Sequence, residues 1–159
     1  MLILGYTPAS FADTMVFMDI TQEVHSLEYA KELDTALAGT NYILNVHLKL
    51  DTGMTRIGVR RGDVLEVRRA IDFHRGIECA GTFTHFATAD VIDDWDFALQ
   101  LNRFQEAVQA IRDAGLETGL VHCDNTPGTI LHRECQFDMC RVGIGLYGLQ
   151  PAETTAPRI

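Results

Sequence analysis

Several features are scarce in this sequence, and each scarcity excludes a class of protein. No apolar run is long enough to span a bilayer. The N-terminus also lacks the basic residues followed by an apolar stretch that are typical of a signal peptide. A cytoplasmic location is therefore the default expectation. Basic residues are few: 13 lysines and arginines stand against 22 acidic residues, which gives a formal net charge of −9. Because phosphate backbones are bound by basic surfaces, nucleic acid is not expected as the main partner.

Cysteine is too sparse for a recognisable metal motif. The sequence has four cysteines: Cys79, Cys123, Cys135 and Cys140. They could be combined with His122 and His132 as zinc ligands, but no CxxC pair exists. Cys79 and Cys123 lie in apolar, strand-like runs, where a thiol behaves as a small hydrophobic group. We therefore expect reduced, mostly buried thiols and no metal.

Strand-like and helix-like segments alternate along the chain. The expected strands are residues 2–6, 20–24, 43–50, 77–84, 120–123 and 139–142. The expected helices are residues 26–38 with Ser26 as the cap, a helix beginning near 62–63, residues 94–114, and a short helix from Pro127. In the longest helix, a stripe at helical spacing predicts core packing: Phe97, Leu101, Phe104, Val108 and Ile111.

This alternation predicts a parallel α/β sheet with helices outside it. The spacing fits either an open doubly wound sheet or a segment of a barrel. No GxGxxG follows the first strand, which weakens the dinucleotide-binding alternative. The 159 residues suffice for one domain with a core, but they are few for a complete closed barrel.

The segment from His47 to Val59 is the most informative part of the sequence. Val46, Leu48 and Leu50 would point to one side of a strand, while Asn45, His47, Lys49 and Asp51 would point to the other. A strand with one apolar face and one ionisable face, ending in a glycine turn, predicts a polar cavity lined by strand ends. Such a cavity is typical of an active site.

A second polar cluster is expected after the last two strands. Thr126 has the chemistry of a helix N-cap and Pro127 suits the first helical position, so free amides would point into the mouth of the sheet. The next strand ends in Arg141, followed by Gly143, and so adds a cation and exposed amides. By analogy with barrels that bind phosphate after their last two strands, this combination predicts a phosphate-bearing ligand.

Four segments in this order and spacing, HLKLDTGMTRIGV, GTFTHFATAD, HCDNTPGT and MCRVGIGLYGLQP, resemble the pyridoxal-phosphate barrel domain of alanine racemases. The resemblance covers nearly the whole chain. It implies a partial TIM (β/α)8 barrel with about six of eight strand–helix units over residues 1–150. Residues 151–159 would be a linker toward a C-terminal β-domain. The membrane-bound serine/alanine racemases of glycopeptide resistance are also similar, so the preferred amino acid stays open.

The resemblance implies a cofactor, pyridoxal 5'-phosphate, and roles for residues around it. Arg141 would face the pyridine nitrogen; because an arginine keeps its proton, the ring would remain a weak electron sink, which suits racemisation. His85 would support this arginine through a hydrogen bond, although a satisfied core histidine is an equal alternative. The phosphate would be held by Asn125, Thr126 and the amides of Gly143 and Ile144.

Two further residues match family positions near the substrate. Arg56 would contact the cofactor's phenolic oxygen and the substrate carboxylate, and Lys49 would carry a carbamate that orients Arg56. A physical cause is available: at roughly 4 Å and an effective dielectric near 20, an ammonium and Arg56 would repel by about 4 kcal/mol. This repulsion would depress the pKa of Lys49 and leave an amine that reacts with carbon dioxide. A strand lysine with its ammonium extended to solvent is the alternative.

Neither proton-transfer base of the family, a cofactor lysine and a catalytic tyrosine, has a matching position in this sequence. We therefore expect a fragment of a PLP-dependent alanine racemase, an isomerase that supplies D-alanine for peptidoglycan and forms a homodimer at full length. Alone, the fragment should be inactive and prone to associate, because its sheet has unpaired edges. The alternatives are a serine or broad-specificity racemase of the same fold and a non-catalytic PLP- or phosphate-binding module.

Overall fold

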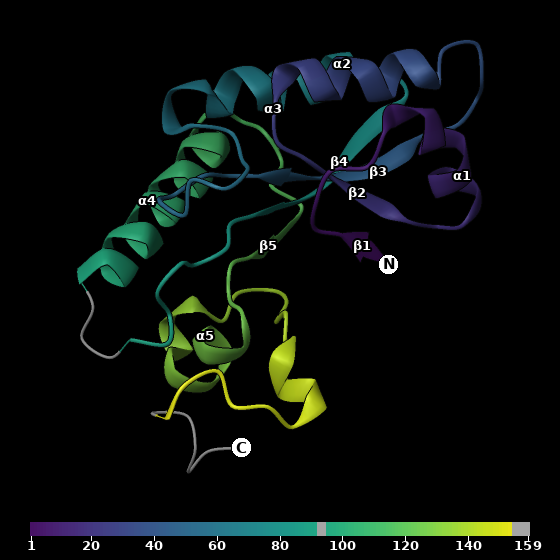
Figure 1. Cartoon of the computed structure of the whole chain (residues 1–159). Helices are drawn as coiled ribbons and strands as arrows, with labels where there is room; N and C mark the ends of the chain where they lie inside the picture. The colour runs from purple at the N-terminus through teal and green to yellow at the C-terminus, as the bar shows by residue number, and fades with distance from the viewer. Residues whose placement is uncertain (92–94, 154–159) are drawn as a thin grey trace.

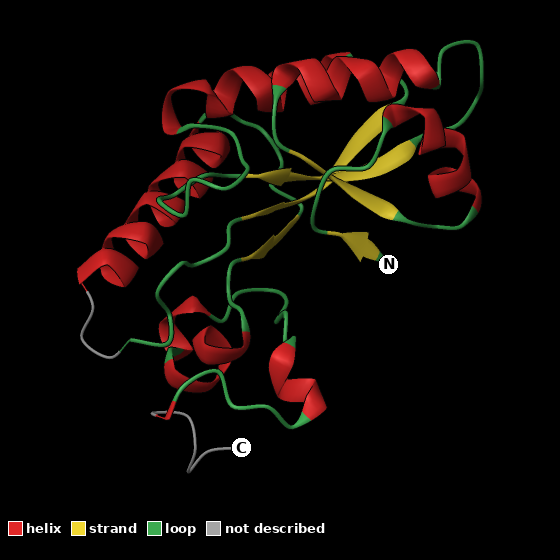
Figure 2. Ribbon diagram, viewed as in Figure 1, coloured by secondary structure: helices red, strands yellow, loops and turns green. Residues whose placement is uncertain are grey.

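The computed structural model describes residues 1–91 and 95–153. Within these residues, five parallel strands form one sheet in sequential order, curled into half of a barrel (Figures 1 and 2). The strands are β1 (Leu2–Ile3), β2 (Thr21–Val24), β3 (Leu44–Lys49), β4 (Ile77–Phe83) and β5 (Leu120–His122). Each strand pairs in parallel with the next. The predicted α/β partial barrel is therefore confirmed, with five strands in the described residues where about six were expected.

Helices follow the strands, and most of them cover the outer side of the sheet, whereas the helix after the last strand lies beyond the end of that strand (Figure 1). The α-helices are α1 (Ala12–Phe17), α2 (Leu27–Ala36), α3 (Val64–Phe73), α4 (Trp95–Asp113) and α5 (Thr126–Leu131). Four short 3-10 helices complete the described part: η1 (Ala9–Phe11), η2 (Arg61–Asp63), η3 (Arg133–Cys135) and η4 (Ile144–Tyr147). Helix α1 was not expected from the sequence. None of the described helices is long and apolar enough to cross a bilayer.

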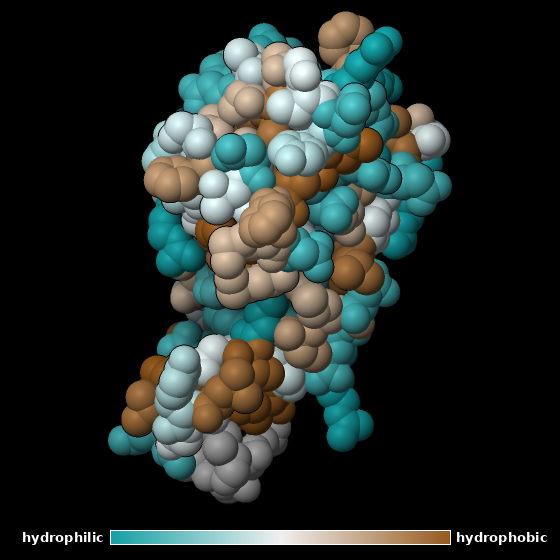
Figure 3. All heavy atoms as spheres, turned by 90° about the vertical axis from the view of Figure 1, so that its right-hand side faces the viewer, coloured by the Kyte–Doolittle hydropathy of each residue, from teal (hydrophilic) through white to brown (hydrophobic). Residues whose placement is uncertain are grey.

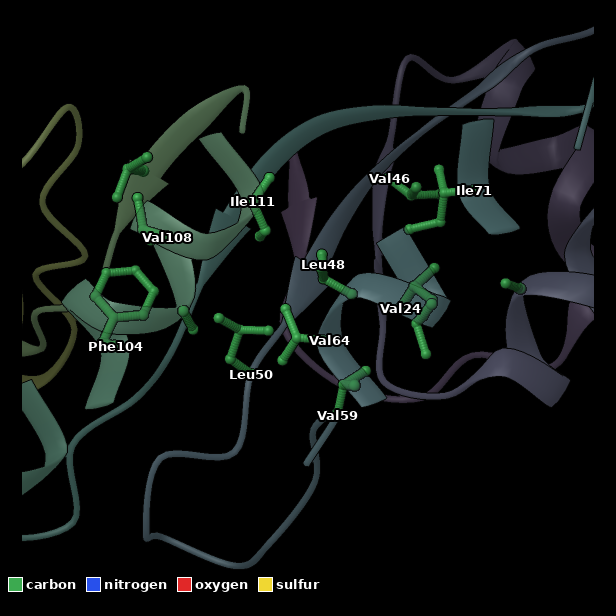
Figure 4. Close-up of a cluster of buried hydrophobic side chains, with 14 of the residues drawn as sticks. Val24, Val46, Leu48, Leu50, Val59, Val64, Ile71, Phe104, Val108 and Ile111 are labelled. Carbon is green, nitrogen blue, oxygen red and sulfur yellow. The ribbon is translucent and has the colours of Figure 1, made fainter. Parts of the chain in front are cut away.

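The main core lies between the sheet and these outer helices (Figure 4). The predicted apolar face of β3 is confirmed, because Val46, Leu48 and Leu50 are all buried there. The predicted stripe of α4 is also buried along its whole length. Ser26 caps α2 as expected, and its hydroxyl accepts a hydrogen bond of 3.0 Å from the backbone N–H of Tyr29.

The strand predicted at residues 139–142 is wrong. The described part of the sheet ends at β5, and Asp138 explains why the chain does not continue the ladder. Its backbone N–H donates to the carbonyl of Val121 at 2.9 Å, while its carboxylate accepts from the N–H of the same residue at 2.8 Å. Because this side chain occupies the N–H that a sixth strand would need, the segment leaves the sheet and carries Arg141 across the strand ends.

Helix α5 begins one residue earlier than predicted. Its N-cap is Asn125, whose side chain accepts a hydrogen bond of 3.1 Å from the N–H of Gly128. Thr126 was expected to be the cap, but it is the first helical residue, and its hydroxyl is used elsewhere.

The cysteines and the C-terminal segment complete the comparison with expectation. Cys123 and Cys135 are buried, Cys79 is half-buried and Cys140 is exposed, so the prediction of buried thiols is wrong for Cys140. The expected linker falls mainly on residues 154–159, which lie outside the described residues. Before the expected linker, Leu146 and Leu149 are exposed. Figure 3 shows hydrophobic surface in the lower part of the molecule as well as on the main body.

Candidate functional site at the carboxyl ends of the strands

Ionisable side chains line the inner side of the half-barrel. His47 and Lys49 project from β3 and His122 from β5, and all three are buried. They alternate with the core residues of the same strands, as the pleat requires. Phe83 of β4 lies between them, with its ring stacked on that of His122 at a centroid distance of 4.8 Å. A wall of buried polar groups and one aromatic ring therefore faces away from the helices.

Arg141 lies at the carboxyl ends of β4 and β5 and is held by several acceptors. Its Nη1 donates to Nδ1 of His122 at 2.6 Å, and its Nη2 donates to the carbonyl oxygens of Thr84 at 2.8 Å and Cys123 at 3.1 Å. Its Nε is buried and makes no hydrogen bond. The guanidinium is thus fixed by neutral acceptors and keeps its full charge.

His85 is a weaker neighbour of the arginine than the sequence indicates. Its Nδ1 lies 3.4 Å from Nη2 of Arg141, at the long limit for a hydrogen bond. His122 makes the shorter contact, at 2.6 Å, although from the sequence it was considered only as a zinc ligand and rejected. The available signal was its position at the end of a strand, as the first residue of the HCDNTPGT segment.

The loops after β5 and before η4 meet at the hydroxyl of Thr126. The Oγ1 atom accepts hydrogen bonds from the backbone N–H groups of Gly143 at 3.0 Å and Gly145 at 3.2 Å. Gly145 permits this approach, because a Cβ there would lie 2.8 Å from the methyl group of Thr126. Since both lone pairs of the hydroxyl are occupied, its hydrogen is left to donate to a further acceptor.

These loops surround a pocket of about 400 Å³, which is within the range of small-ligand sites. Six of the residues predicted to bind the cofactor line it together: His85, Asn125, Thr126, Arg141, Gly143 and Ile144. Leu4, which follows β1, reaches the same pocket from the other edge of the half-barrel. The predicted convergence of Thr126, Gly143 and Arg141 is confirmed as geometry.

Lys49 and Arg56 do not line this pocket. The Nζ of Lys49 donates to the carbonyl oxygen of Leu50 at 2.7 Å and lies 5.5 Å from the centroid of the Phe83 ring. Arg56 is exposed in the loop after β3. The structure therefore places Lys49 in the interior, as a reactive amine would require, and leaves Arg56 at the surface of the described part.

Burial is the main cause of the low pKa of Lys49. The pKa is lowered to about 8, mainly by desolvation and less by Arg141 and Arg56, while Asp51 and Glu23 act to raise it. The expected direction is correct, but the expected cause is wrong, because Arg56 has the smallest effect of these five. An exposed guanidinium is screened by water and repels the lysine weakly.

The three histidines near Arg141 are held in their neutral form. Burial, and to a lesser extent the charge of Arg141, together lower the pKa of His47 and of His85 to about 4 and that of His122 to about 2. Neutral imidazoles can accept a hydrogen bond from a guanidinium, whereas imidazolium ions cannot.

The fold and the site together define a β/α barrel protein with a cation and a hydroxyl-bearing loop at the carboxyl ends of its strands, where barrels bind ligands. A family model described as "Alanine racemase, N-terminal domain" matches residues 1–151. The chain belongs to this family.

Individual proteins agree with the family match. An alanine racemase of Desulfovibrio desulfuricans is 39% identical over 152 residues, which are 96% of this chain and 41% of the relative. The solved alanine racemase of Clostridium difficile 630 superposes with a TM-score of 0.89 at 32% identity, over 96% of this chain and 42% of that one. A histidine racemase of Leuconostoc mesenteroides subsp. sake has a TM-score of 0.86 at 29% identity, over 99% of this chain and 41% of that one. The chain spans about two fifths of each of these proteins.

Proposed function

We propose that this chain is the cofactor-binding half-barrel of a pyridoxal-phosphate-dependent racemase that interconverts L- and D-alanine. The observation that carries the proposal is the pocket shared by Arg141, Thr126 and Gly143, in a chain of the alanine racemase family. In the whole enzyme, this activity would supply D-alanine for peptidoglycan. A homodimer is proposed for the full-length protein.

The residues present fit the cofactor. The free hydrogen of the Thr126 hydroxyl can donate to a phosphate oxygen, and the loop of Gly143 and Ile144 lines the same part of the pocket. Arg141 lines the pocket as well, so a ring nitrogen there would meet a guanidinium. When bound, pyridoxal phosphate supplies a conjugated ring that withdraws electrons from the α-carbon of an attached amino acid.

Arg141 would determine what that ring can do. A guanidinium donates hydrogen bonds but does not give up its proton near neutral pH, so a ring nitrogen facing it stays unprotonated. The ring would then accept electrons only weakly, which favours prompt return of the α-proton over transamination. A carboxylate at this position would have the opposite effect.

Lys49 and Arg56 are proposed to complete the substrate side. Lys49 would be carbamylated, because its buried amine has a lowered pKa and can react with carbon dioxide while neutral. The resulting anion would attract Arg56 inward from the surface loop, where it could hold the substrate carboxylate and the phenolic oxygen of the cofactor.

Proton transfer at the α-carbon needs two bases on opposite faces of the substrate. The lysine and the tyrosine that serve in the family have no matching position in these 159 residues. We therefore expect the chain alone to bind the cofactor without racemising alanine. Activity requires the remaining parts of an enzyme of this family.

A hybrid enzyme tests the proposal. The matched segment of the Desulfovibrio desulfuricans alanine racemase would be replaced by residues 1–151 of this chain, and the formation of D-alanine from L-alanine measured. We expect racemisation by the hybrid and its loss in the Arg141→Glu hybrid. A folded hybrid that binds pyridoxal phosphate without racemising any amino acid would favour a non-catalytic binding module instead.

A racemase for another amino acid is the second candidate. The structural neighbour described as a histidine racemase has nearly the same TM-score as the alanine racemase, so this half-barrel is compatible with other substrates. Assays with L-serine and L-histidine on the same hybrid and on the unmodified parent enzyme distinguish the two. A preference that shifts with this segment would favour the alternative, which includes serine or broad specificity.

A further inference from the structure

The half-buried Arg141 is the first member of a chain of three side chains, and the other two, His122 and His47, are buried. Its Nη1 lies 2.6 Å from Nδ1 of His122, and Nε2 of His122 lies 2.8 Å from Nδ1 of His47. These residues come from the C-terminal segment, β5 and β3, so the chain of hydrogen bonds crosses the inner side of the half-barrel. His122 is fully buried and His47 is 5% exposed.

The guanidinium determines the direction of every bond in this chain. An arginine has donors and no acceptor, so Nδ1 of His122 must accept and its proton must be on Nε2. That Nε2 then donates to Nδ1 of His47, which must accept in turn, and the proton of His47 is left on Nε2. If His122 were protonated, its Nδ1–H would face the N–H of Arg141, and the two donors could not form a hydrogen bond. If His47 were protonated, its Nδ1–H would face the Nε2–H of His122 in the same way.

The backbone of β4 supports His47 from behind. The register between β3 and β4 shifts after Val46, so that Gly81, rather than Ala80, is opposite His47. A Cβ at Gly81 would lie 2.5 to 2.7 Å from three atoms of the imidazole ring. The ring therefore occupies the space that any other residue at position 81 would fill, and it is confined between β4 and His122.

We infer that His47 is a positioning residue for Arg141, acting through His122, and that the guanidinium fixes both imidazoles as their Nε2–H tautomers. His47 touches neither the pocket nor Arg141. Its effect is to keep His122 oriented so that Nδ1 stays aimed at the guanidinium. The consequence for cofactor binding rests on the proposed function, whereas the tautomers do not.

The tautomers can be measured directly on the 159-residue chain without any cofactor. Nitrogen-15 NMR of the labelled chain at neutral pH should show protonated Nε2 and unprotonated Nδ1 for both His47 and His122. A proton on Nδ1, or an imidazolium ion, at either residue would overturn the inference. In Arg141→Met the donor is lost, and we expect His122 to become a mixture of tautomers; an unchanged His122 would also contradict the inference.

The positioning role is tested with two ligands. We expect His47→Leu to weaken binding of pyridoxal phosphate about tenfold, because it removes the acceptor for His122, while His47→Asn, whose side-chain oxygen replaces Nδ1, retains most of the affinity. A deaza analogue of the cofactor, with carbon in place of the ring nitrogen, should bind both variants alike. Equal losses for the two ligands would mean that His47 acts only on stability.

Glycine variants provide a matched control. Gly81→Ala displaces the His47 ring, so it should reproduce the ligand selectivity of His47→Leu even though Gly81 lies away from the pocket. Gly62→Ala adds the same methyl group where nothing lies within 4 Å, and should leave binding unchanged. If the native chain binds neither ligand, the proposed function fails and the NMR measurement still decides the inference.

Discussion

The hydroxyl oxygen of Thr126 accepts a hydrogen bond of 3.0 Å from the backbone N–H of Gly143. This bond joins the start of α5 to the segment before η4, across 17 positions of the sequence. The hydroxyl thereby shapes one side of the pocket and keeps its own hydrogen for a ligand. Substitution of Thr126 tests both functions together.

Thr126→Val should weaken pyridoxal phosphate binding by roughly tenfold to a hundredfold, because it removes a donor to a charged acceptor. It also leaves the N–H groups of Gly143 and Gly145 without their acceptor. Thr126→Ser keeps the hydroxyl and is the control. Titration of each variant with the cofactor measures the effect, and equal affinity of the valine and serine variants would exclude a phosphate contact at this position.

The lowered pKa values of two buried histidines and of the half-buried His85 predict lower stability in acid. His47 and His85 have folded pKa values of about 4 and His122 of about 2, against 6.5 when unfolded. Below pH 6.5 the unfolded chain therefore binds more protons, so the free energy of unfolding falls as the pH drops. Each histidine contributes at most about 1.4 kcal/mol per pH unit.

His25 acts in the opposite direction, because its hydrogen bond to Glu23 raises its pKa and adds stability in acid. Because three histidine pKa values are lowered and one is raised, the net effect of acid is a loss of stability. Urea unfolding at pH 7.5 and pH 5 should show a lower midpoint at pH 5. A midpoint that is constant or higher in acid would mean that these imidazoles are not held neutral.

The burial of Lys49 predicts carbamylation that does not depend on Arg56. Native mass spectrometry in bicarbonate buffer should show the added mass of one carbon dioxide, and Lys49→Arg should abolish it. Arg56→Gln should retain the modification, because Arg56 has the smallest effect on the pKa of Lys49. Loss of the added mass in Arg56→Gln would instead support repulsion as the cause.

The cap of α2 predicts a modest stability effect away from the site. Ser26→Ala should lower the free energy of unfolding by about 1 kcal/mol, since the N–H of Tyr29 loses its acceptor. Ser10→Ala, at an exposed position in η1, is the control and should change stability little. Equal stabilities of the two variants in urea unfolding would contradict the role of this cap.

Local patterns predicted the regular part of the fold well. Ser26 before an apolar periodicity indicated the start of α2, and alternation along β3 indicated which side chains face the helices. The strand predicted at residues 139–142 does not form, because the Asp138 carboxylate accepts a hydrogen bond from the N–H of Val121, which lies 17 positions away in the sequence. A pattern of neighbouring residues carries no information about such a contact.

In the site, too, local patterns predicted some features, whereas contacts between residues far apart in the sequence were missed. Thr126, Arg141 and Gly143 were predicted from strand ends, helix starts and the family resemblance, and the structure brings them to one pocket. The link between His122 and His47 joins residues 75 positions apart and requires both the register shift and Gly81. His47 was expected on the polar face of its strand and His122 at the end of another strand, but no local pattern indicates that the two rings are hydrogen-bonded to each other.

We propose that a single pocket binds a phosphate-bearing ring and that the Thr126 hydroxyl donates a hydrogen bond to the phosphate. The most direct test of this proposal compares pyridoxal 5'-phosphate with pyridoxal, which lacks the phosphate, in equilibrium titrations of the native chain. We expect saturable binding of pyridoxal 5'-phosphate and an affinity for pyridoxal that is weaker by at least about tenfold. Equal binding of the two compounds, or binding of neither, would contradict it.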